Sequence, residues 1–121
     1  MRTLGPVSAP FPSLQTLVKA WGRVDGGGTP VLSDNYGIAS ITDATVGMLD
    51  VTLMVPFESS TSYAVIANCM NTEAAVNQRA TLSSTTAPST TAFRIINSNL
   101  AGTTADPVGA TGGYHFIVLG V

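Results

Sequence analysis

The chain has 121 residues and a net charge of −2, and 45% of its residues are hydrophobic whereas only 10% are charged. Its few cations are dispersed and no apolar run reaches the length of a membrane span, which excludes strong nucleic-acid binding and membrane insertion. Since a typical domain is about 25% charged, we expect one domain with part of its surface covered in an oligomer.

The first predicted element is an extended N-terminal arm, residues 1–14. Its prolines Pro6, Pro10 and Pro12 are incompatible with a helix and lack the N–H that a β-ladder needs. Between them stand apolar residues that suit contact with another protein better than a solvated tail. We interpret these as candidate anchors, with a disordered tail as the alternative: Leu4, Val7, Phe11 and Leu14.

Residues 15–121 are predicted to form one β-domain. Runs of alternating, β-branched or aromatic residues are separated by turn signals such as Asp25-Gly26-Gly27-Gly28. Residues 72–79 offer at most one or two turns of helix. The pattern predicts an all-β, antiparallel, jelly-roll-like β-sandwich. The expected strands are Thr16–Val24, Tyr36–Thr42, Met48–Val55, Ser62–Met70, Gln78–Ser83, Ala92–Asn97 and Tyr114–Val121.

The strand over Met48–Val55 alternates as a half-buried strand does, with Leu49, Val51, Leu53 and Val55 on one side. The last strand differs, because both of its faces are apolar. One face can lie in the sandwich core, and the other then needs cover from another subunit. We expect a subunit interface at three of its residues, which are Tyr114, Phe116 and Val118.

Catalytic constellations are missing from the sequence. Cys69 lies in an apolar run, as a buried small hydrophobe does, and nothing links it to His115, the one histidine. The carboxylates are scattered, and the donors fit neither a zinc cluster nor a calcium loop. We therefore expect no enzymatic activity, no metal and no cofactor.

Two features could contact a receptor or a glycan. Trp21 shares a strand face with Lys19 and Arg23, opposite Ala20 and Val24, where it serves either as an exposed binding aromatic or as a lid over the core edge. The loops 83–91 and 97–113, in which Asp106 is the single charged residue, offer hydroxyl and amide groups. The candidate receptor contacts are Trp21, Thr85, Thr86 and Asn99, with passive surface as the alternative for the loops.

An ordered series of segments resembles a β-domain of bacteriophage tail-fibre and other virion structural proteins. The segments are Lys19–Pro30 (KAWGRVDGGGTP), Asp34–Asp43 (DNYGIASITD), Leu49–Leu53 (LDVTL) and Ser62–Ile66 (SYAVI). They span residues 19–66, somewhat under half of the chain. Asp50 and Leu53 depart from the family pattern, which has aromatic residues there.

This resemblance implies a homotrimeric β-domain on the exterior surface of a virion, similar to a tail-fibre terminal domain. The expected partners are other copies of the chain, other phage structural proteins and a host-surface glycan. A capsid decoration or head-fibre protein that docks through residues 1–14 is the alternative. A glycan- or receptor-binding module is the alternative of another class.

Overall fold

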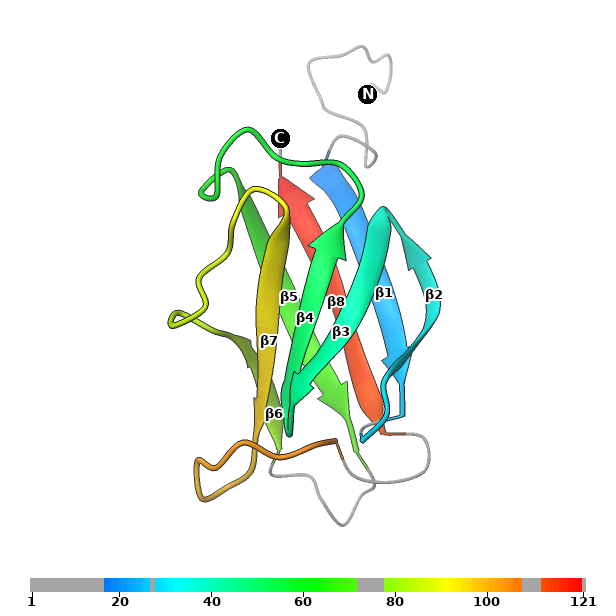
Figure 1. Ribbon diagram of the computed structural model, residues 1–121, viewed down its shortest axis with the longest axis vertical. Coiled ribbons are helices and arrows are strands. Elements are labelled where there is room, and N and C mark those ends of the chain that lie inside the picture. The colour runs from blue at the N-terminus through cyan, green and yellow to red at the C-terminus, as the bar shows by residue number, and fades with distance from the viewer. Residues whose placement is uncertain (1–16, 27, 72–77, 108–111, 121) are drawn as a thin grey trace, which may run out of the picture.

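The computed structural model describes residues 17–26, 28–71, 78–107 and 112–120, and these fold into two antiparallel sheets packed face to face (Figure 1). Sheet A contains four strands in the order β2 (Val31–Tyr36), β1 (Val18–Asp25), β8 (Gly113–Gly120) and β5 (Tyr63–Met70). Sheet B contains four strands in the order β3 (Ile38–Thr45), β4 (Met48–Leu53), β7 (Ala92–Ser98) and β6 (Arg79–Leu82).

The expected all-β fold of two antiparallel sheets is confirmed, and the described residues contain no helical element. The arm over residues 1–14 and most of the short helix candidate at 72–79 lie outside the described residues. One strand was missed by the sequence interpretation. β2 is an edge strand whose residues are almost all exposed, so it lacks the apolar alternation that marked the other strands.

Gly37 explains why β2 and β3 are separate strands in different sheets. Its φ of +73° is a left-handed conformation that side chains disfavour, and it turns the chain from sheet A to sheet B. A Cβ at this position would lie 2.7 Å from the carbonyl oxygen of Lys19. The turn is therefore pressed against β1, and only glycine fits there.

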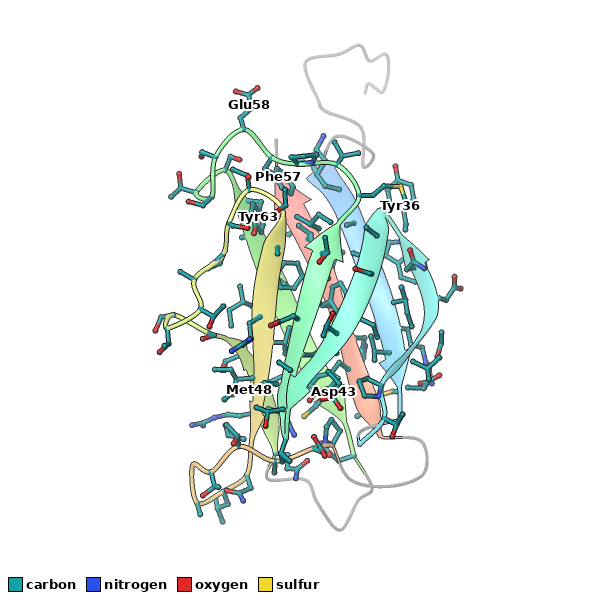
Figure 2. The ribbon with its side chains drawn as sticks, viewed as in Figure 1. Tyr36, Asp43, Met48, Phe57, Glu58 and Tyr63 are labelled. Atoms are coloured by element: carbon teal, nitrogen blue, oxygen red, sulfur yellow. The ribbon has the colours of Figure 1, made fainter. Side chains whose placement is uncertain are left out.

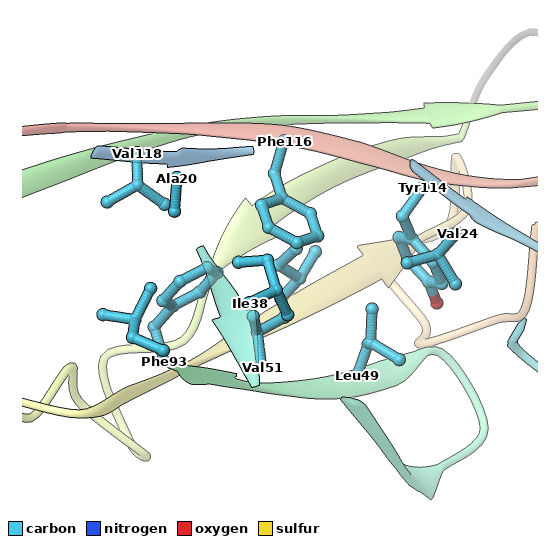
Figure 3. Packing of buried hydrophobic residues seen from close by; sticks show 11 residues of the cluster. Ala20, Val24, Ile38, Leu49, Val51, Phe93, Tyr114, Phe116 and Val118 are labelled. Atoms are coloured by element: carbon cyan, nitrogen blue, oxygen red, sulfur yellow. The ribbon is translucent and has the colours of Figure 1, made fainter. Parts of the chain in front are cut away.

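The core lies between the sheets and is built by inward-facing residues of both (Figure 3). Along β4, Leu49, Val51 and Leu53 are buried, as the alternation predicts. Val55 does not continue this series, because β4 ends at Leu53 and the Val55 side chain is 72% exposed. The buried hydrophobic residues are Ala20, Val24, Ile38, Leu49, Val51, Leu53, Phe93, Ile95, Tyr114, Phe116 and Val118.

The placement of β8 corrects one expectation. Tyr114, Phe116 and Val118 are at most 4% exposed and fill the core of the chain itself, so no surface of theirs is left for a second subunit. The Phe116 ring packs over Gly22 on β1, where an added Cβ would lie 2.5 Å from its Cζ. The outward face of β8 carries the alternate residues, Ile117 among them.

Candidate functional site

A row of large apolar side chains crosses the outer face of sheet A. Tyr36 on β2 pairs with Trp21 on β1, Trp21 pairs with Ile117 on β8, and Ile117 pairs with Ile66 on β5. Directly opposed residues share a face, so the four side chains form one line across all four strands. Tyr36 and Ile66 are 55% and 56% exposed and Trp21 is 37% exposed. We call these residues the apolar row.

A polar row runs beside it, two positions along each strand. Asp34 pairs with Arg23, Arg23 with His115, and His115 with Asn68. Arg23 Nε donates to Asp25 Oδ1 at 3.1 Å, and the Ser33 hydroxyl donates to the other carboxylate oxygen. The Ser33 hydrogen bond, and after it the Arg23 hydrogen bond, holds the pKa of Asp25 below its usual value.

Between the two rows the surface is hollowed. The depression has a volume of about 310 Å³. Its apolar wall is formed by Trp21, Ile66 and Ile117, and its polar wall by the Arg23, Asn68 and His115 side chains. Such a surface can bury an apolar side chain of a partner or stack a flat ring against the indole.

The outer face of sheet B is of the opposite character. Arg94 on β7 donates from Nε and Nη2 to the two carboxylate oxygens of Asp50 on β4, at 2.6 and 2.9 Å. This bidentate pair lowers the pKa of Asp50, chiefly through the hydrogen bonds from Arg94. Thr42 on β3 stands beside Asp50. Sheet B thus has one buried face and one outer face that carries an ion pair, whereas the outer face of sheet A combines the apolar row with the polar row.

A second apolar surface lies at one end of the sandwich. It is a hollow of about 680 Å³, which we call the end pocket. Figure 2 shows Tyr36, Phe57 and Glu58 at this end, and Met48 and Asp43 at the opposite end. The pocket is lined by Lys19, Ala20, Asn35, Tyr36, Gly37, Leu53, Met54, Val55, Pro56, Phe57 and Glu58.

Backbone contacts hold the wall of the end pocket in place. Met54 N donates to Gly37 O, and Phe57 N donates to Thr90 O, both at 2.9 Å. The Phe57 ring stacks on Tyr63 with centroids 4.4 Å apart. Met54 nevertheless remains 62% exposed and Val55 72% exposed. The end pocket was not predicted from the sequence, because Val55 was assigned to the buried side of a longer strand.

The candidate receptor contacts do not come together. Trp21 faces outward on sheet A, as expected, with Ala20 and Val24 on the opposite, buried side. Thr85 and Thr86 lie in the connection from β6 to β7, where Thr86 N donates to Ser83 Oγ, and Asn99 follows the far end of β7. The four anchor residues, Leu4, Val7, Phe11 and Leu14, lie outside the described residues.

Cys69 and His115, the residues considered as catalytic candidates in the sequence, lie in sheet A. Cys69 is partly buried on β5, and Asn71 Nδ2 lies 3.1 Å from its sulfur. His115 is exposed in the polar row. In the described part of the chain, no three His, Cys, Asp or Glu side chains gather to hold a metal ion. Among the described residues there is likewise no helix long and apolar enough to cross a membrane.

Comparison with known proteins adds no assignment: no family model, no curated protein and no solved structure matches this chain.

Proposed function

We propose that this protein is a non-enzymatic structural component of a phage virion, a jelly-roll-like β-sandwich that works as a homotrimer on the exterior of the particle. The observation that carries self-association is the apolar row on the outer face of sheet A. The resemblance of residues 19–66 to tail-fibre and virion β-domains supports the phage setting and the trimer. Capsid decoration through residues 1–14 is the alternative position on the particle.

The physical case for self-association rests on the contrast between the two outer faces. Full burial of a large apolar side chain contributes about 1.5–3 kcal/mol. The apolar row offers four such side chains in register. Sheet B instead presents a bidentate ion pair and threonines. A partner that packs on the apolar row therefore gains apolar burial at four positions that carry no charge, and another copy of the same face meets this requirement.

The test of self-association is a charge placed in the apolar row. Ile66→Lys should convert the oligomer to monomers, because an interface would have to bury an unpaired ammonium group. Thr81→Lys is the matched control, since Thr81 is also exposed on an edge strand, β6 of sheet B. Native mass spectrometry of the three proteins at low micromolar concentration gives the stoichiometry. A wild-type protein that is monomeric would refute the proposal.

The position on the virion needs a separate experiment. An image reconstruction of the particle should show trimeric density of this size on its outer surface. Copies repeated over the shell would indicate decoration of the capsid, and a few copies at one vertex would indicate the tail. Particles that lack the chain altogether would contradict the virion assignment, but they would not bear on the proposal of self-association.

One observation favours a second candidate function, glycan binding. The hollow of about 310 Å³ is lined by the Trp21 indole together with the amide of Asn68 and the imidazole of His115. Sugars stack their apolar face on indoles and bond to such polar groups. If the hollow binds a glycan, the wild type should give a glycan-array signal, and Asn68→Ala should abolish it while leaving the oligomeric state unchanged. If the hollow serves assembly alone, neither the wild type nor Asn68→Ala should give a glycan signal.

A further inference from the structure

The end pocket is an apolar surface that neither sheet covers. Tyr36, Met54 and Val55 are each more than half exposed, although they stand together around one hollow. Exposed apolar clusters of this kind mark a contact with something else. The end pocket is distinct from the apolar row, because it is formed by chain at the end of the sandwich and only Tyr36 belongs to both.

We infer that the end pocket binds residues 10–14 of the same chain, with the Phe11 ring seated against Met54. The first described residue, Leu17, stands two positions before Lys19, which itself lines the pocket. An extended chain spans at most about 3.5 Å per residue, so the six positions from Phe11 to Leu17, where the described chain begins, reach about 21 Å. Residues 10–14 can therefore reach the pocket at the wall that Lys19 forms.

The chemistry of the segment fits the pocket. Phe11 stands between Pro10 and Pro12, and such proline-flanked segments adopt the extended polyproline II conformation at low entropic cost. Segments of this type bind grooves lined by aromatic side chains, which Tyr36 and Phe57 supply here. The Met54 thioether is a favourable neighbour for an aromatic ring.

Covalent connection favours the chain's own segment over a free competitor. A short tether gives an effective concentration in the millimolar range, so weak apolar contacts are enough to keep the pocket filled. The segment carries little charge to oppose burial, because Arg2 is the single charged side chain among residues 1–16. Leu4 and Val7 lie farther from Leu17 and remain available to other partners, so the inference does not depend on the proposed function.

The experiment is methyl NMR of the full chain labelled at the methionine methyl groups. With Phe11 in place, ring current should shift the Met54 methyl signal upfield, and nuclear Overhauser contacts should join it to the Phe11 ring. Phe11→Leu should abolish both. The Met48 methyl, at the opposite end of the sandwich, should keep its position and report that the fold is intact. Val7→Ala is the matched control and should leave Met54 unchanged.

Two results would overturn the inference. The first is a Met54 methyl signal at the same position in the wild type and in Phe11→Leu, which would mean that the ring is elsewhere. The second comes from a co-refolded mixture of labelled Phe11→Leu chain and unlabelled wild-type chain. If the labelled Met54 regains its upfield shift there, the occupant is the segment of a neighbouring subunit and not of the same chain.

Discussion

Asn97 is the most constrained polar residue of the described core. Its side chain is fully buried, and Nδ2 donates to Ala105 O at 2.7 Å and to Gln78 Oε1 at 3.2 Å. Its backbone N–H donates to Gly47 O, and its carbonyl accepts from Ala105 N. Asn97 therefore ties the segment after β7 to the turn between β3 and β4. Among the described atoms, its Oδ1 is buried without a hydrogen-bond partner.

Removal of this amide should destabilise the fold. Asn97→Ala leaves the Ala105 carbonyl without its side-chain donor, and an unsatisfied buried polar group costs about 1–3 kcal/mol. Urea unfolding measures the loss in the free energy of unfolding. Asn68→Ala is the control, because Asn68 is exposed on β5 and should change stability by less than about 0.5 kcal/mol. Equal losses in the two variants would show that the buried contacts of Asn97 contribute nothing.

The Asp50–Arg94 pair gives stability a dependence on pH. Its hydrogen bonds lower the pKa of Asp50 in the folded state, so its contribution is present above the unfolded pKa of about 3.9 and is lost as pH falls through the folded pKa. Both side chains are partly exposed, so the contribution should stay below about 1 kcal/mol. The difference in unfolding free energy between wild type and Asp50→Asn should shrink from pH 7 to pH 3; a constant difference would contradict this.

At the scale of the element, β8 carries the sharpest prediction. Val118 is 0% exposed between β1 and β5, so Val118→Asp would bury an unpaired carboxylate at a cost of about 3–5 kcal/mol. Thr86→Asp places the same charge in the exposed β6–β7 connection and should be nearly neutral. Soluble yield and thermal unfolding of the two variants provide the measurement. Similar behaviour would mean that β8 is not a central strand.

The same strand shows what could be predicted from the sequence. The sequence shows that both faces of β8 are apolar. The alternation of odd and even positions does not, however, tell which of the two faces packs against the chain's own core. That choice follows from the pairing of Trp21 with Ile117 and of Gly22 with Phe116, which joins positions far apart in the sequence. The end pocket was missed for a similar reason, because its walls come from β1, the Gly37 turn and the segment after β4.

At the scale of the molecule, the distribution of charge bears on how copies would meet in the proposed oligomer. Only 10% of the residues are charged, and two described ion pairs, Arg23–Asp25 and Arg94–Asp50, already satisfy four of these charges within the chain. The apolar row itself contains no charge. Contact between copies through sheet A should therefore be driven by apolar burial and not by attraction between ions.

Salt separates these two driving forces. Sodium chloride at 1 M shortens the screening length to about 3 Å and weakens association through exposed ions, whereas sulfate strengthens apolar burial. The dissociation constant of the proposed oligomer, measured by sedimentation velocity, should not increase between 0.05 and 1 M sodium chloride and should decrease in sodium sulfate at equal ionic strength. Weaker association in sodium chloride would instead indicate an interface at the polar row, where Arg23 of one copy would contact Asp34 of another. That result would contradict the apolar row as the interface.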